Sequence, residues 1–253
     1  MKQILLFIVQ DADEEDLLYP LLREKNGQFL MRFALMRSDL LSRRSTVDRA
    51  KRTMEHFVKE YMANHHLRMD DLCGVVQLTS IESIYHPEQL LLVNPSICQK
   101  MRQRIVYQEE YIYFDRPEDL KNFQRLSQQK RKVIKELIQT PYLFEGLPYH
   151  LYYFSRNLPH VLDLVERESL QERSEEDGEK SYWEEGKASV DGAFTSLKLE
   201  NFNEALAFFT KTGLCPERNY QASWKMLEER ETHLLPLSNF GQILVEIDQF
   251  TQD

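Results

Sequence analysis

The chain lacks long apolar runs. None of its hydrophobic stretches approaches the about 20 residues that a helix needs to cross a membrane. The opening stretch, MKQILLFIVQD, is too short and too soon acidic for a secretory signal peptide. Hydrophobic residues make up 42% and charged residues 29% of the 253 positions, which is the balance of a globular protein with a sizeable core. We therefore expect a cytoplasmic protein without a membrane partner.

Cysteine and glycine are also scarce. The three cysteines, Cys73, Cys98 and Cys215, lie far apart without paired spacing, which favours buried reduced thiols over a disulfide framework or a zinc ribbon. The eight glycines form neither a G-x-G-x-x-G nor a Walker pattern, so a glycine-rich phosphate loop is not expected. No serine stands in a nucleophile elbow, and no cysteine has a context that suggests activation.

Positive charge is in deficit, but it is unevenly distributed. The net charge of −9 argues against a protein that coats nucleic acid through bulk charge, and residues 166 to 185 are strongly acidic. Two basic groups nevertheless occur: Arg37, Arg43, Arg44, Arg49, Lys51 and Arg52, and then Lys121, Arg125, Lys130, Arg131, Lys132 and Lys135. Each group is typical of a solvated helix face, although a basic face can also hold a phosphate backbone. The candidate nucleic-acid contacts are Arg43, Arg44, Lys51, Arg156 and Asn157.

The first half of the chain alternates strand and helix patterns. Residues 3 to 10 and 72 to 80 are apolar runs of buried-strand length, and residues 27 to 39 follow a turn signal and read as a further strand. Residues 45 to 66 carry apolar side chains at helical spacing. Short connections between such elements predict an α/β fold with a mostly parallel sheet flanked by helices.

The second half is less regular. Residues 111 to 115 and 149 to 154 are aromatic strand candidates, and a helix is predicted between them. A further helix is expected from Asn157. We predict an α/β domain over residues 1 to 166, an acidic linker over 167 to 181 and a helical C-terminal region over 182 to 253, through which the protein could form oligomers.

Polar residues follow the first and third predicted strands, in VQDADEED and QLTSIES. In an open parallel sheet, ligands and metals gather beyond the carboxyl ends of the strands. Carboxylates from Asp11, Asp13, Glu14 and Glu82 could there form a catalytic site, with Asp11, Glu14 and Glu82 holding Mg²⁺ or Mn²⁺. Acids at a helix start also match the helix dipole without any metal, and both interpretations stay open.

The stretch LLFIVQDADEEDLLYPLL, residues 5 to 22, resembles the opening of a Toprim domain, the catalytic fold of topoisomerases, primases and nucleases of the OLD and RloB types. VVQLTSIES, residues 75 to 83, lies where the family's second motif would fall, and YHLYYFSRNLPHVLDL, residues 149 to 164, is similar to the downstream strand and helix of small RloB-like proteins. The resemblance covers about residues 3 to 166. It implies a Toprim-like fold and a site in which one glutamate and two aspartates hold magnesium or manganese.

The chain departs from that motif at each key position. Gln10 stands at the family glutamate, Asp11 at the following glycine, Ser80 at the first aspartate and Glu82 at the second. A neutral amide or hydroxyl neither cancels the charge of Mg²⁺ nor offsets its dehydration. Loss of two of three carboxylates should cripple two-metal phosphoryl chemistry. We therefore expect a fold that has lost the usual catalysis.

Three functional hypotheses remain. The first is a catalytically degenerate Toprim-like protein of a bacterial mobile-element or defence system that binds nucleic acid or a protein partner and needs no cofactor. The second is an active Mg²⁺- or Mn²⁺-dependent nuclease with a shifted acidic set, for which His160 is the best general acid–base candidate in the second half. The third is a structural or regulatory protein-interaction module.

Overall fold

The computed structural model describes residues 3–10, 12–25, 29–36, 47–81, 84–108, 111–155, 158, 161, 199, 201–211, 214–229 and 237–252. Within these ranges, no helix combines the length and the apolar character that a membrane crossing requires. 

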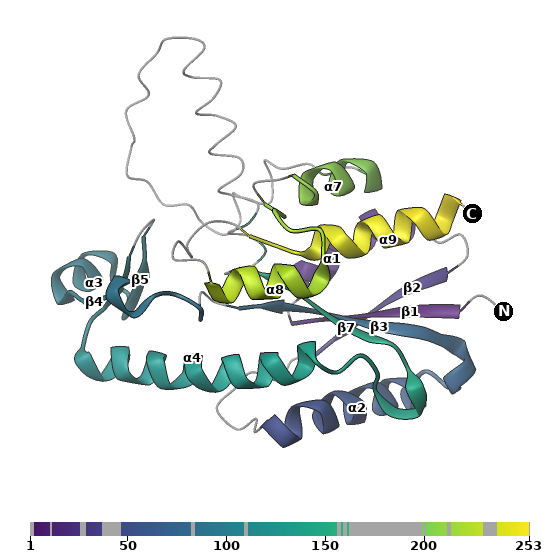
Figure 1. Ribbon diagram of the computed structural model, residues 1–253, viewed down its shortest axis with the longest axis horizontal. Helices are drawn as coiled ribbons and strands as arrows, with labels where there is room; N and C mark the ends of the chain where they lie inside the picture. The colour runs from purple at the N-terminus through teal and green to yellow at the C-terminus, as the bar shows by residue number, and fades with distance from the viewer. Residues whose placement is uncertain are drawn as a thin grey trace, which may run out of the picture.

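A four-stranded parallel sheet lies at the centre of the molecule, with strand order β2-β1-β3-β7 (Figure 1). Its strands are β1 (Gln3–Val9), β2 (Phe29–Leu35), β3 (Leu72–Ser80) and β7 (Tyr149–Phe154). The central strands β1 and β3 are almost continuously buried, which explains why their sequences are apolar runs without alternation. The predicted parallel sheet is confirmed.

Helices cover both faces of this sheet (Figure 1). The helices α2 (Val47–Asn64) and α4 (Pro117–Ile138) pack together on one face. The helices α1 (Ala12–Arg23), α7 (Phe202–Phe209) and α9 (Phe240–Gln252) cover the other. Side chains alternate along each strand, so Leu6 and Ile8 enter the first core while Phe7 and Val9 enter the second. The α/β class is thus confirmed, as is the helical character of the C-terminal region.

The C-terminal helices pack directly on the sheet. The ring of Phe154 in β7 lies 5.9 Å from that of Phe240 and 6.3 Å from that of Phe209, measured between centroids. The helix α8 (Tyr220–Glu229) contributes Trp224 and Leu227 to the core on the α2 and α4 side. The predicted linker, residues 167 to 181, lies outside the described residues.

A small second sheet precedes α4, and the sequence did not predict most of it. Its strands are β4 (Leu91–Val93), β5 (Ile105–Tyr107) and β6 (Ile112–Phe114), in the order β4-β6-β5. The helix α3 (Pro95–Met101) lies between β4 and β5 along the chain. The aromatic strand predicted at residues 111 to 115 is β6, which therefore belongs to this sheet and not to the central one. Short 3₁₀ helices at Met69–Asp71, Glu88–Leu90 and Phe144–Gly146 complete the described elements.

Side chains of the C-terminal region close the edge of the sheet at β7. The Tyr220 hydroxyl donates to the Leu151 carbonyl at 3.0 Å and accepts from the Leu151 amide at 3.1 Å. Asn239 Oδ1 accepts from the Tyr153 amide at 2.7 Å, and Ser238 Oγ donates to the Tyr153 carbonyl at 2.8 Å. These side chains satisfy backbone groups that a further strand would otherwise pair.

The substitution Tyr220→Phe tests this closure. It removes the one hydroxyl that makes both hydrogen bonds to the backbone of the fully buried Leu151, so we expect the free energy of unfolding to fall by about 1–3 kcal/mol. Tyr19→Phe is the matched control, because Tyr19 is 43% exposed, and it should change stability by less than about 0.5 kcal/mol. Urea denaturation of both variants measures the difference, and equal stabilities would show that the hydroxyl is dispensable.

Candidate functional site

The candidate site lies where the strand order reverses. The chain passes from β1 to β2 on one side and then crosses to β3 on the other side of β1. In open α/β sheets, the crevice beyond the carboxyl ends of the strands at such a point is the usual ligand position. Gln10 directly follows β1, and Ser80 is the last residue of β3. Gln10 and Ser80, the two neutral residues within the motif that the sequence resembles, therefore meet at the switch point.

The side chain of Gln10 bridges the ends of β1 and β3. Its Nε2 donates to Thr79 Oγ1 at 3.2 Å, and its Oε1 accepts from the Ser80 amide at 3.0 Å. Thr79 is fully buried and Gln10 is half-buried. An amide suits this position because it presents one donor and one acceptor to two different partners.

Glu14 completes the bridge from the first turns of α1. Its carboxylate accepts from the backbone N–H of Gln10 at 2.9 Å through Oε2 and from Ser80 Oγ at 3.5 Å through Oε1. The side chain is only 1% exposed, so these hydrogen bonds compensate part of the cost of burying a carboxylate. We call Gln10, Glu14, Thr79 and Ser80 the strand-end latch.

The four latch residues by themselves, without Asp11 and Glu82, do not form a magnesium site. Mg²⁺ prefers oxygen ligands, carboxylates above all, in an octahedral arrangement. Here the Gln10 amide oxygen and both Glu14 carboxylate oxygens already accept hydrogen bonds. Among the residues whose placement is described, no group of three or more His, Cys, Asp or Glu side chains could hold a metal ion.

Several predicted site residues cannot be placed relative to the latch. Asp11, Glu82, His160, Arg43, Arg44, Arg156 and Asn157 lie outside the described residues. Asp13 belongs to α1, but its side chain is not described. Lys51 lies on α2, where its Nζ is 3.9 Å from Glu55 Oε1, so this predicted contact already has an anionic neighbour. The shifted acidic set stays a prediction.

Thr79, Gln77 and Tyr149 were not predicted as site residues. The Tyr149 hydroxyl of β7 donates to Gln77 Oε1 of β3, and both side chains are at most 2% exposed. Burial raises the pKa of Tyr149 well above its usual value, so the hydroxyl stays protonated and donates. Polar residues inside otherwise apolar strands were the available signal, but their partners lie about 70 positions away along the chain.

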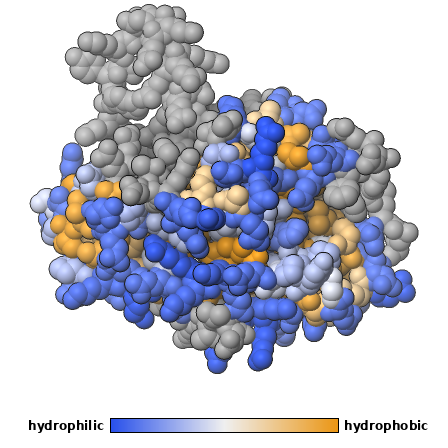
Figure 2. Space-filling model, in the orientation of Figure 1, coloured by the Kyte–Doolittle hydropathy of each residue, from blue (hydrophilic) through white to orange (hydrophobic). Residues whose placement is uncertain are grey.

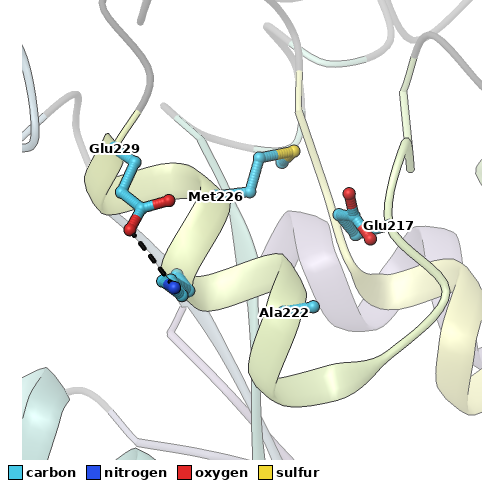
Figure 3. A pocket seen from close by; sticks show the side chains of 5 residues that line it. Glu217, Ala222, Met226 and Glu229 are labelled. Atoms are coloured by element: carbon cyan, nitrogen blue, oxygen red, sulfur yellow. Dashed lines mark ion pairs between the residues drawn. The ribbon is translucent and has the colours of Figure 1, made fainter.

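A separate surface hollow lies beside α8 (Figure 3). It has a volume of about 320 Å³ and is lined by Glu217, Ala222, Lys225, Met226 and Glu229. Lys225 Nζ lies 3.5 Å from Glu229 Oε1, and both side chains are largely exposed. The lining thus offers an ordinary surface ion pair rather than a catalytic constellation.

The cysteines show no sign of activation. All three are free thiols; Cys98 and Cys215 are buried, and Cys73 is half-buried. Burial raises the pKa of both Cys73 and Cys215 to about 11, and the Cys73 thiol donates to the Ile4 carbonyl at 3.3 Å. Thiolate nucleophiles instead have lowered pKa values.

No family model, curated protein or solved structure matches this chain. The Toprim resemblance therefore still rests on the sequence motifs.

Gln10→Ala tests the latch. The substitution leaves the Ser80 amide and the Thr79 hydroxyl without their partner, so we expect a loss of about 2 kcal/mol in the free energy of unfolding. The control is Gln3→Ala at the exposed start of β1, which should cost less than about 0.5 kcal/mol. Urea denaturation compares the two, and equal losses would refute a stabilising role for the Gln10 amide.

The rate at which Cys73 is alkylated at different pH values tests whether its thiol is inactive. Because burial raises the pKa of Cys73 to about 11, we expect its alkylation by iodoacetamide at pH 8 to be much slower than that of a free cysteine in solution. The rate of Cys73 alkylation should still rise between pH 8 and pH 10. Circular dichroism must confirm that the protein stays folded over this range. Mass spectrometry of the alkylated peptides measures this, and fast modification at pH 8 would contradict it.

Proposed function

We propose that this chain is a catalytically degenerate Toprim-like protein, of the kind found in bacterial mobile-element or defence systems, which binds nucleic acid or a protein partner without cutting nucleic acid. The observation that carries the proposal is the engagement of the Gln10 amide by Thr79 and Ser80. This position corresponds to the metal-binding glutamate in the motif that the sequence resembles.

Charge explains how such a site can exist without metal. A glutamate at position 10 would bring a second carboxylate close to the buried Glu14, because the Gln10 side chain contacts the amide of Ser80 and the Glu14 carboxylate contacts the hydroxyl of the same residue. Two carboxylates that share a neighbouring residue in a buried site repel one another unless a proton or a cation neutralises one of them. A glutamine removes this need, so the strand ends are joined by hydrogen bonds where an active relative would join them through a cation.

Ser80 supports the same conclusion at β3. Its hydroxyl donates to Glu14 Oε1 at 3.5 Å, so it serves the carboxylate as a donor. An aspartate here would repel Glu14 in the absence of metal. Gln10 and Ser80, which stand where the motif has a glutamate and an aspartate, thus favour the same metal-free arrangement.

The rival hypothesis is an active nuclease that uses Asp11, Asp13, Glu14 and Glu82. It requires Glu14 to exchange its hydrogen bonds with Gln10 and Ser80 for a metal ion. It predicts manganese-dependent cleavage of nucleic acid that Glu82→Ala abolishes. Manganese titration together with a cleavage assay separates the two hypotheses.

The test is isothermal titration with Mn²⁺. We expect a flat trace for the natural chain and a saturable signal for Gln10→Glu/Ser80→Asp, which places three carboxylates around one point. Manganese should also raise the thermal midpoint of the double variant, since ligands stabilise the state that binds them. The control is Gln3→Glu/Gln103→Glu, which adds the same charge at exposed positions and should stay flat.

The natural chain should also leave plasmid DNA and RNA intact in manganese. Saturable manganese binding or cleavage that is lost in Glu82→Ala would replace the proposal with the active nuclease. A double variant that remains folded but binds no more tightly than the control would refute the assignment of Gln10 and Ser80 to a metal-site frame.

A further inference from the structure

The solvent-exposed side of α4 carries a row of cations. Lys121, Arg125, Lys132 and Lys135 are all exposed, and they lie at positions i, i+4, i+11 and i+14 of one helix, which places them on a single face. The exposed Gln128 lies between them on that face. We call the four cations the α4 cationic row.

The acids of α4, Glu118, Asp119 and Glu136, flank this row but form no ion pair with it within the described ranges. Residues 120 to 135 contain six lysines and arginines and no acid, although the whole chain has a net charge of −9. None of the four members has an ion pair within the described ranges. Like charges four residues apart destabilise a helix by a few tenths of a kcal/mol. The row therefore lowers the stability of α4 as long as no anionic partner is bound.

Arg131, another cation of α4, has a structural role. Arg131 is half-buried, its Nε donates to the Ile84 carbonyl at 2.7 Å, and its guanidinium lies 5.3 Å from the centre of the Tyr85 ring. It thereby fastens the segment after β3 to α4. The α4 cationic row makes no such contacts with the residues that the structure describes, which leaves it available to a partner.

The neighbouring helix extends the positive surface. Arg49 and Arg52 of α2 are exposed, and α2 packs beside α4 on the same face of the sheet (Figure 1). The buried sides of both helices enter one core, so their exposed sides face away from the sheet. In Figure 2 the lower part of the molecule, where these helices lie, is predominantly hydrophilic.

The chemistry of this face selects the kind of partner. None of the large exposed hydrophobic side chains of the described chain lies on α2 or α4, whereas protein interfaces have an apolar and aromatic core. The large exposed side chains of the described residues also include no phenylalanine, tyrosine or tryptophan ring on α2 or α4 on which the bases of a single strand would stack. Cations and amides without apolar anchors suit a phosphate backbone.

The dimensions agree with this partner. The row spans 14 residues, or about 21 Å at 1.5 Å per residue. One strand of a duplex advances about 3.4 Å per phosphate along its axis, so the row is long enough to contact several successive phosphates.

We propose that the outward face of α2 and α4 binds the phosphate backbone of a nucleic-acid duplex through the α4 cationic row, without reading its sequence. The inference specifies the partner left open by the proposed function, but the geometry that carries it does not involve the latch.

The test is fluorescence anisotropy of a labelled 30-base-pair DNA duplex of arbitrary sequence, with an RNA duplex of the same sequence in parallel. We expect Lys121→Gln/Arg125→Gln/Lys132→Gln/Lys135→Gln to weaken binding on the order of 100-fold and to reduce the salt slope by about 3 to 4, since each lost phosphate contact removes about 0.9. The control, Arg23→Gln/Arg104→Gln/Lys211→Gln/Lys225→Gln, removes the same charge at exposed positions elsewhere and should stay close to the natural chain. Circular dichroism and urea denaturation confirm that both variants fold.

Several outcomes would overturn the inference. The first is that the natural chain does not bind the duplex at low salt. The second is that the salt slope of its binding is shallower than about −1. The third is that both quadruple variants bind the duplex equally weakly. Competition by polyglutamate as effective, charge for charge, as unlabelled duplex would indicate an acidic protein partner instead. Manganese-dependent cleavage would remove the proposed function but not this surface, whereas a flat duplex titration would remove this surface and leave the latch argument intact.

Discussion

The structure depends on the requirement that a parallel sheet be covered on both faces. Strand β1 has side chains buried on each side, with Leu6 directed to the α2 and α4 layer and Phe7 to the α1, α7 and α9 layer. Apolar burial at about 25 cal/mol per Å² makes such strands stable only when both layers are present. The second layer includes Phe202, Phe209 and Phe240, which lie about 200 residues further along the chain. The C-terminal helices are therefore part of the architecture of the sheet itself.

Buried polar groups place a second constraint on the same sheet. At the carboxyl ends of the strands, the amide of Gln10 and the carboxylate of Glu14 connect β1, β3 and α1. At the β7 edge, side chains from residues 220 and 239 replace the hydrogen bonds of a missing neighbour. Apart from the Glu14 carboxylate, both arrangements use neutral donors and acceptors, which need no compensating charge when they are buried. This preference agrees with a strand end that works without a cation.

The sequence predicted the elements whose signals are local. The continuous apolar runs of β1 and β3 and the helical spacing of α2 identified the central fold, and Gln10 and Ser80 were correctly expected at strand ends. Strands β4 and β5 have three residues each, too few to show a period, and β6 was found without its sheet because pairing is not a local property. The partners of Gln10 lie 69 and 70 residues away, so only the fold could reveal that its amide is engaged.

The late position of the second layer has a consequence for synthesis on the ribosome. The strands β1, β2, β3 and β7 are complete by residue 154, but one face of their sheet, including Phe7 and Phe154, has most of its cover only after residue 202. At about 5–20 residues per second, a nascent chain would carry this apolar face for several seconds before the covering helices emerge. During that interval the growing chain presents a binding surface for chaperones, and the completed chain withdraws it.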